Sequence, residues 1–141
     1  MLKGIDPLLN ADLLYILRAM GHGDDIVIAD ANFPAEANAK KLVRMEAASA
    51  TQMARAILSV MPIDDFVDDA ALRIEVVGAP DEEPPVCQEF AAMLQAEGAA
   101  LGKIDRFAFY ERTKRAFAVI ATGEQRLYGC LLLKKGVIRP A

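Results

Sequence analysis

The chain has 141 residues, of which 54% are hydrophobic and 26% charged, and its formal net charge at pH 7 is -4. This length and composition fit a single globular domain over residues 1–141 and exclude a disordered chain. The net negative charge, with lysine and arginine scattered, disfavours nucleic acid and anionic membranes as partners because both are polyanions.

Targeting and metal-binding signals are absent from the sequence. No apolar segment approaches the roughly 20 residues of a membrane span, and Met1–Gly4 lacks the apolar core of a signal peptide. Cys87 and Cys130 stand at neither metal-ligand nor redox spacing, and His22 is the one histidine. We therefore expect a cytoplasmic protein with two free thiols and no metal site.

The first predicted elements are a helix and a buried strand. Asn10 is a favourable N-cap, apolar residues at helical spacing follow it, and Gly21 fits a left-handed glycine that ends a helix. The apolar run 26–29 contains β-branched residues and is closed by Asp30. Such a run predicts a buried strand of the parallel kind.

A second helix and a second strand follow. Ser49 and Gln52 have the spacing of a capping box, and an apolar face continues from them until the breaker Pro62. In the segment 72–76 apolar and charged residues alternate, which predicts a strand of which one face can be solvated.

The last third of the chain predicts a loop, a helix and two more strands. Prolines, a glycine and acids at 78–85 indicate an exposed loop, and 86–94 has the apolar spacing of a helix that Gly98 can cap. The apolar runs 117–122 and 128–133 can pair as a hairpin or lie apart. Helices alternating with buried strands predict a three-layer α/β/α domain around a mostly parallel or mixed central sheet.

The first candidate for chemistry is His22, which lies between Gly21 and Gly23 just before a predicted strand. An imidazole with a pKa of about 6.5 suits proton transfer near neutrality, and flanking glycines give a small molecule access to it. The simpler interpretation is a polar turn after a helix, with the histidine in water. A dinucleotide fingerprint is excluded because Ile26 holds its third glycine position and the motif precedes a strand.

Two later segments carry further candidates. Arg106 could offer a planar donor fork to adjacent sugar hydroxyls, and Tyr110 a ring face to the C–H face of a sugar. Tyr128, Gly129 and Cys130 enter the last predicted strand, where a glycine would let backbone groups approach a ligand. For the Arg106 segment, core aromatics with surface arginines are the commoner explanation. For Tyr128–Cys130 the simpler explanation is ordinary strand residues with a bend at Gly129.

Taken in order, these motifs resemble one family, the L-fucose mutarotases and their relatives the D-ribose pyranases. The resemblance is carried by four groups of residues along almost the whole chain. They are Met20–Asp24, Asp30–Pro34, Arg106–Arg112, and a C-terminal group made of Thr122–Glu124, Tyr128–Gly129 and Leu132–Val137. The resemblance implies a ribose pyranase-like fold and an isomerase that opens a cyclic hemiacetal and recloses it on the other face.

The resemblance also implies roles for individual residues. His22 resembles the acid that protonates the ring oxygen, Asp30 and Arg106 resemble ligands of substrate hydroxyls, and Tyr128–Cys130 resembles the strand that completes the pocket. Ring opening needs one proton delivered and one removed, so general acid and base catalysis suffices and no cofactor is required. The family forms rings of subunits, commonly decamers, with sites near subunit contacts.

Two positions depart from the family pattern. Cys130 stands where the fucose enzymes usually carry asparagine, and a thiol is a weaker donor and acceptor than an amide. Asn32 stands where some relatives have histidine.

The leading hypothesis is a mutarotase that interconverts the α and β anomers of L-fucose or a related aldose. The alternatives are a D-ribose pyranase, which converts pyranose to furanose, and a non-catalytic monosaccharide-binding accessory of a sugar uptake system.

Overall fold

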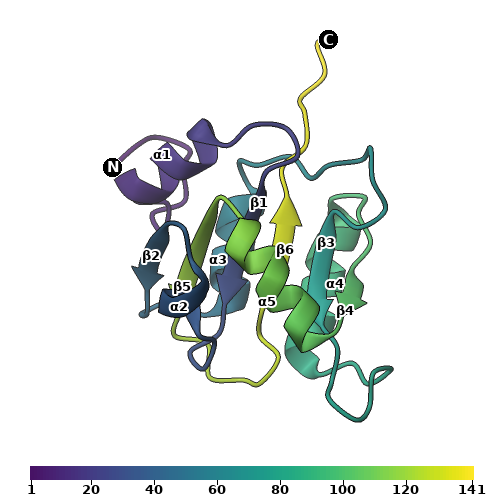
Figure 1. Ribbon diagram of the computed structural model, residues 1–141. Coiled ribbons are helices and arrows are strands. Elements are labelled where there is room, and N and C mark those ends of the chain that lie inside the picture. Colours follow the sequence, from purple (N-terminus) through teal and green to yellow (C-terminus); the bar gives the residue numbers. More distant parts are fainter.

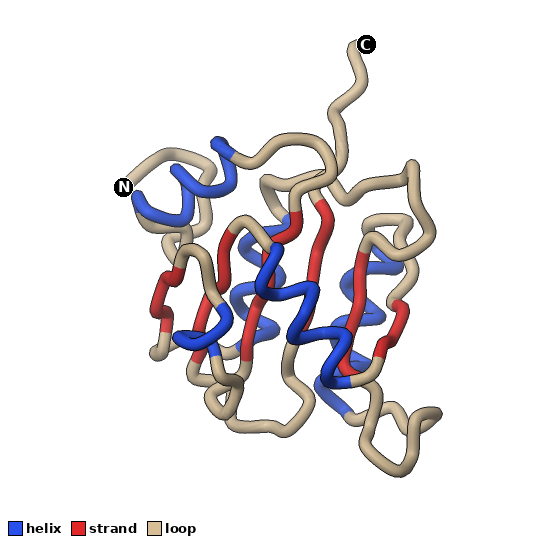
Figure 2. The backbone as a smooth tube through the Cα atoms, viewed as in Figure 1, coloured by secondary structure: helices blue, strands red, loops and turns tan.

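A six-stranded sheet forms the centre of the molecule in the computed structural model, which describes all residues 1–141 (Figures 1 and 2). The strands are β1 (Asp25–Ala29), β2 (Leu42–Met45), β3 (Ala71–Ile74), β4 (Gly102–Ile104), β5 (Ala118–Thr122) and β6 (Leu131–Lys134). The helices are α1 (Ala11–Ala19), α2 (Ala35–Asn38), α3 (Ala50–Leu58), α4 (Pro85–Ala96) and α5 (Arg106–Arg115). No helix combines the length and the apolar composition that a membrane span requires.

The sheet has the strand order β2-β5-β1-β6-β3-β4 and is mostly parallel but mixed. Strand β6 runs antiparallel to both of its neighbours, β1 and β3, and the other three pairings are parallel. Because β1 lies between β5 and β6, the last two strands do not form a hairpin. The two runs that the sequence predicted as strands at 117–122 and 128–133 therefore lie apart in the sheet.

Different helices cover the two faces of the sheet. Ile26 and Ile28 of β1 belong to a core of 24 buried residues that includes side chains of α1, α3 and α4. Val27 and Ala29 point the other way, into a core of 11 buried residues that includes Ala35 of α2 and others from α5. This alternation is the period of two that a strand imposes. Figure 1 shows α2 and α5 in front of the sheet and α3 and α4 behind it, so the predicted three-layer α/β/α architecture is confirmed.

Local capping signals explain where several helices begin. The Asn10 side chain accepts a hydrogen bond from the backbone N–H of Leu13, and Ser49 and Gln52 form the reciprocal capping box at α3. Gly98 follows α4 in the left-handed region with φ +74°, as predicted. The left-handed residue after α1 is Gly23, with φ +88°, and not Gly21 as the sequence suggested. Helix α1 ends at Ala19, and its C-cap Met20 already leaves the helical conformation with ψ 138°.

Three other expectations about the elements were wrong or incomplete. Strand β3 has no solvated face: all four of its residues are buried, and the Arg73 guanidinium donates to the carbonyls of Ile74 and Glu82 at 3.2 and 3.1 Å. Helix α3 ends at Leu58, before the predicted stop at Pro62. The sequence analysis missed α2, β2 and β4, each only three or four residues long, and it named no helix at 106–115, where α5 forms.

Candidate functional site

A mostly apolar pocket that also contains Asp30, Asn32 and Arg106 lies at the edge of the sheet where the parallel strands end. Asp30 follows β1, Arg106 begins α5, and Tyr128 and Cys130 precede β6, so three distant segments meet there. The pocket has a volume of about 200 Å³. It is lined by Asp30, Asn32, Phe33, Ile74, Val77, Arg106, Tyr110, Leu127, Tyr128 and Cys130. In open α/β sheets the carboxyl ends of parallel strands are where ligands bind.

Asp30 is the acidic group of this pocket, and local contacts fix its orientation. The residue is 8% exposed, and its Oδ1 accepts a hydrogen bond from the backbone N–H of Asn32 at 3.0 Å. This Asx turn holds the carboxylate directly beyond the end of β1. A fixed carboxylate at the wall of a cavity can accept hydrogen bonds from ligand hydroxyls.

Cys130 lies beside Asp30 and is a neutral thiol. Its Sγ accepts a hydrogen bond from the backbone N–H of Asp30 at 3.4 Å, and the residue is only 1% exposed. Burial, and to a smaller extent the neighbouring Asp30 charge, raises the pKa of Cys130 well above its ordinary value. The side chain therefore contributes an uncharged, weakly polar surface to the pocket wall.

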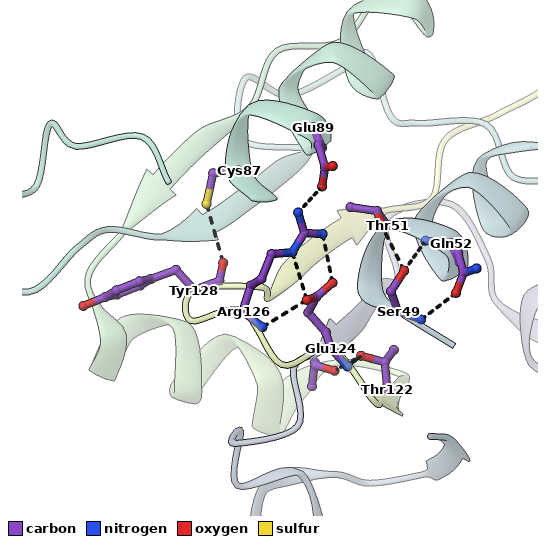
Figure 3. Close-up of polar contacts among 10 residues, drawn as sticks. Ser49, Thr51, Gln52, Cys87, Glu89, Thr122, Glu124, Arg126 and Tyr128 are labelled. Carbon is purple, nitrogen blue, oxygen red and sulfur yellow. Dashed lines mark hydrogen bonds and ion pairs between the residues drawn. The ribbon is translucent and has the colours of Figure 1, made fainter. Parts of the chain in front are cut away.

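Tyr128 has the only left-handed backbone among the non-glycine residues, with φ +64°. This region is unfavourable for a bulky aromatic residue, and such strain persists where surrounding contacts impose it. Two contacts hold Tyr128. Its hydroxyl accepts from the backbone N–H of Val77 at 3.1 Å. The Cys87 thiol donates to its carbonyl at 3.5 Å, as Figure 3 shows. The ring is thus held at the pocket at the expense of local backbone strain.

A buried ion pair supports the loop that carries Tyr128 (Figure 3). The Glu124 carboxylate accepts hydrogen bonds from Nε and Nη2 of Arg126 at 3.0 and 3.1 Å, and Arg126 also pairs with Glu89 at 2.7 Å. The Arg126 guanidinium is the main reason why the pKa of Glu124 is lowered although burial opposes the shift. The contact between Arg126 and Glu89 ties the loop to helix α4, which carries Glu89.

Gly129 has a packing role in the same loop. A Cβ at this position would lie 2.6 Å from Cγ of Glu124 and 3.4 Å from Cβ of Asp30. Any side chain would therefore push apart the buried carboxylate and the pocket aspartate. The sequence suggested that this glycine lets backbone approach a ligand, whereas in the structure it lets the loop approach Asp30.

The opposite wall of the pocket comes from the start of α5. Asp105 caps this helix by accepting from the backbone N–H groups of Phe107 and Ala108, which orients the first turn. Arg106 is exposed, and Tyr110 packs edge-on against Phe33 with the ring centroids 5.4 Å apart. The wall therefore combines a guanidinium fork with aromatic surface, the two features expected for Arg106 and Tyr110.

Several pocket residues were not identified from the sequence as site residues. Phe33, Ile74, Val77 and Leu127 supply apolar lining, and Val77 and Leu127 are 69% and 65% exposed. Phe33 stands in the motif Asp30–Pro34 but was assigned no role there, and no short motif marks Ile74, Val77 or Leu127 as site residues. Asn32, noted only as a departure from the family pattern, also lines the pocket.

His22 lies away from this pocket. It precedes β1 whereas Asp30 follows it, so the five residues of the strand separate the two by about 16 Å at roughly 3.3 Å each. The imidazole is 43% exposed, and its Nε2 lies 3.0 Å from Oδ1 of Asp64. Within one chain, five of the seven predicted site residues line the pocket: Asp30, Arg106, Tyr110, Tyr128 and Cys130. Gly129 lies between two of them without lining it, and His22 lies away from it. Nowhere do three His, Cys, Asp or Glu side chains gather closely enough to hold a metal ion.

The fold and the pocket define an α/β protein with a small-molecule site at the carboxyl edge of its sheet. Comparison with similar proteins identifies the family to which it belongs. Residues 3–138 match the RbsD / FucU transport protein family. The fucose mutarotase of Homo sapiens is 45% identical over 145 residues, covering 97% of this chain and 94% of that protein.

Two solved structures are similar over nearly the whole chain. The fucose mutarotase from Streptococcus pneumoniae, in complex with L-fucose, has a TM-score of 0.91 at 39% identity and covers 98% of this chain and 100% of that one. Bacillus subtilis RbsD, complexed with D-ribose, has a TM-score of 0.77 at 25% identity and covers 99% and 100%. The chain belongs to the RbsD / FucU family. It is an isomerase, a sugar mutarotase.

Proposed function

We propose that this protein interconverts the α and β anomers of L-fucose or a closely related aldose by ring opening, with His22 as the proton-transfer residue. The observation that carries the proposal is the convergence of Asp30, Arg106, Tyr110 and Tyr128 on one pocket. Relatives named fucose mutarotase support the choice of sugar, and so does the greater similarity to the fucose-bound structure than to the ribose-bound one.

The chemistry of the pocket fits a monosaccharide. The Asp30 carboxylate accepts hydrogen bonds from sugar hydroxyls, and the Arg106 fork donates to them. The rings of Phe33 and Tyr110 offer apolar surface to the C–H face of the sugar. Small-molecule sites usually combine an apolar or aromatic lining with a few polar groups that orient the ligand. The neutral Cys130 thiol replaces an amide at the wall, so this side chain discriminates less strongly among hydroxyl positions.

The proposed reaction needs only proton transfer. The exocyclic anomeric hydroxyl loses a proton as the ring oxygen gains one, the bond between C1 and the ring oxygen breaks, and the free aldehyde recloses on its other face. A residue that exchanges protons near neutrality assists both steps, typically by about 10² to 10⁴ in rate. The mechanism uses no cofactor and no metal.

Because His22 and Asp30 stand at opposite ends of β1, we propose that His22 of one copy completes the pocket of a neighbouring copy. Apolar side chains are exposed at both edges: Phe66 packs against His22, Val77 and Leu127 line the pocket, and Phe107 packs against Tyr110 of the pocket. Two different patches that bind each other form a heterologous contact, and such contacts repeat into closed rings. We therefore propose a cytoplasmic homo-oligomeric ring, a decamer in the simplest extension of the family pattern.

The catalytic step is tested by exchange NMR between the anomers of L-fucose. We expect wild-type protein to accelerate exchange and His22→Ala to lose about 10² to 10⁴ of that acceleration. D-Ribose, followed from pyranose to furanose, is run in parallel and is expected to exchange more slowly. Saturable sugar binding without any accelerated exchange would refute catalysis and support a binding accessory instead.

The composite site is tested by complementation. His22→Ala and Asp30→Ala are each expected to be inactive, but a mixed assembly of the two variants regains about one in four sites when the copies mix randomly, because such a site takes Asp30 from one variant and His22 from the other. Recovery of activity only in the mixture supports the shared site. Mixed assemblies that remain inactive would mean that both residues must come from one chain.

A further inference from the structure

A second cavity, of about 440 Å³, lies where strands β3 and β4 and the start of helix α4 meet at one edge of the sheet. Figure 1 shows α4 behind these two strands. The cavity shares no residue with the candidate sugar pocket. It is lined by Arg73, Asp81, Glu83, Cys87, Ala91, Leu101, Gly102 and Lys103. Its volume is typical of small-molecule sites.

The alternation of β3 directs Arg73 into this cavity. Ala71 belongs to the core that α4 covers, whereas Leu72 and Ile74 belong to the core on the α5 face of the sheet. Arg73 therefore faces α4, because alternate residues of a strand share a face. The residue is only 4% exposed. The strand thus places a cation on the inner wall of the cavity.

No acidic side chain forms an ion pair with Arg73. The guanidinium donates to the carbonyls of Ile74 and Glu82, which are neutral acceptors. Burial raises the pKa of the neighbouring Cys87 thiol although the Arg73 charge opposes the rise, so the thiol is neutral as well. A buried charge is costly unless an opposite charge joins it. An anion in the cavity would supply that charge.

A second cation lines the cavity from the edge strand β4. The Lys103 ammonium contacts Asp81 at 2.7 Å, but this carboxylate is fully exposed, and exposed ion pairs contribute little because water competes for both charges. Glu83, the other acid of the lining, is also exposed and contacts neither cation within ion-pair distance. Water and salt screen both acids, whereas the buried Arg73 is screened much less. The cavity therefore favours an anion.

We infer that this cavity is a second binding site, which takes the phosphoryl group of a small phosphomonoester between Arg73 and Lys103. Such a group carries about -1.5 to -2 charges at pH 7, which matches two cations. The planar Arg73 fork suits phosphate oxygens, and the ammonium adds a point charge. Ala91 and Leu101 give the organic part of the ligand an apolar wall. The site does not depend on the function proposed for the sugar pocket.

The binding test titrates phenyl phosphate, inorganic phosphate and acetate into the full chain by isothermal calorimetry. We expect saturable binding of phenyl phosphate, weaker binding of inorganic phosphate because it lacks an apolar part, and the weakest binding of acetate because it carries one charge. Acetate or inorganic phosphate that binds as tightly as phenyl phosphate would overturn the assignment to a phosphomonoester. Absence of saturable binding by phenyl phosphate would overturn the site itself.

Variants of the two cations test which groups bind the ligand. Arg73→Met should weaken the affinity for phenyl phosphate by about 10- to 100-fold, the usual worth of hydrogen bonds to a charged group. Arg55→Met is the matched control, because it removes one positive charge from an exposed position of α3 outside the cavity. We expect this control to bind as the wild type does, and wild-type affinity in Arg73→Met would overturn the inference.

Lys103→Met keeps the inference testable if Arg73→Met does not fold. Lys103 is exposed on an edge strand, so its replacement leaves the buried core intact. We expect a smaller loss of affinity than in Arg73→Met, because water already competes for this ammonium. Unchanged affinity for phenyl phosphate in Lys103→Met would contradict a site built on both cations.

Chemical-shift mapping separates this site from the candidate sugar pocket, which contains an arginine of its own, Arg106. In ¹H–¹⁵N spectra we expect phenyl phosphate to shift the amide signals of Cys87 and Gly102 and to leave that of Asn32 unchanged. Shifts confined to Asn32 and Arg106 would place the anion in the sugar pocket and overturn the inference. Because the readout is binding and not anomer exchange, a failure of the proposed function is distinguishable from a failure of this site.

Discussion

The ion pair between the buried Glu124 carboxylate and the partly exposed Arg126 gives a quantitative prediction about the loop that carries Tyr128. The Glu124 side chain is 5% exposed and accepts three hydrogen bonds from Arg126, one from the backbone N–H and two from the guanidinium. Loss of one partner from a fully buried pair costs about 3–5 kcal/mol because the other charge is left in a low dielectric. Arg126 is 42% exposed, so water replaces part of what it loses.

We therefore expect Glu124→Ala to lower the free energy of unfolding by about 1.5–3 kcal/mol. At about 4 °C per kcal/mol for a domain of this size, the melting temperature falls by about 6–12 °C. Glu89→Ala removes only the more exposed partner of Arg126, because the Glu89 side chain is 49% exposed. This variant should lower the free energy of unfolding by less than about 1 kcal/mol. Scanning calorimetry of the three proteins measures both effects, and equal losses in the two variants would contradict the assignment of Glu124 as the dominant partner.

The same pair predicts a direction for the pH dependence. Because the folded-state pKa of Glu124 lies below its ordinary value of 4.5, its ionised form stabilises the fold fully above about pH 4.5, and this contribution is lost as the pH falls through the folded-state pKa. The difference in melting temperature between wild type and Glu124→Gln should therefore shrink on acidification. A difference that stays constant well below pH 4.5 would refute the electrostatic reasoning.

Three further predictions follow from local contacts. Gly129→Ala places a Cβ 2.6 Å from Cγ of Glu124, so we expect a loss of about 1–3 kcal/mol from overpacking and weaker sugar binding by titration; unchanged affinity would mean that the loop adapts freely. Ser49→Ala removes the cap of α3 and should lower the free energy of unfolding by about 1 kcal/mol in a denaturant melt. Anomer exchange should not change, because α3 covers the face of the sheet away from α5. A lower exchange rate would contradict that separation. Burial raises the pKa of the Cys130 thiol, so iodoacetamide at pH 8 should modify it far more slowly in native than in unfolded protein, as followed by mass spectrometry; equal rates would show an accessible thiolate.

Much of the local structure could be predicted from the sequence because its causes are local. The Asn10 cap and the Ser49–Gln52 capping box use side chains within three residues of the groups that they bind, and the apolar run 26–29 has the composition of a buried strand. The errors arose where short elements carry too few residues for a period to emerge, as in β2 and β4. Alternation at 72–76 was misleading because the charged Arg73 is buried and satisfied by carbonyls on a strand covered on both faces.

The candidate site likewise has features that the sequence revealed and features that only the fold decided. Its residue types were recognisable, and the resemblance to a sugar-isomerase family grouped Asp30, Arg106 and Tyr128 before any coordinates. Which of them meet was decided by the sheet: the insertion of β6 beside β1 brings Tyr128 and Cys130 to Asp30, and the return through α5 adds Arg106 and Tyr110. Asp64 could not be identified as a partner of His22, because 42 residues separate them and only hydrogen bonds to the end of β6 join their segments.

The sequence by itself thus determined the caps, the buried strands, the three-layer class and the family, since these depend on neighbours along the chain or on motifs in order. Only the tertiary structure decided the strand order, the lining of the pocket, and the separation of His22 from Asp30 by the length of β1. The physical reason is that strand pairing and side-chain convergence are selected by burial of the whole sheet between two helical layers, and no single segment carries that information.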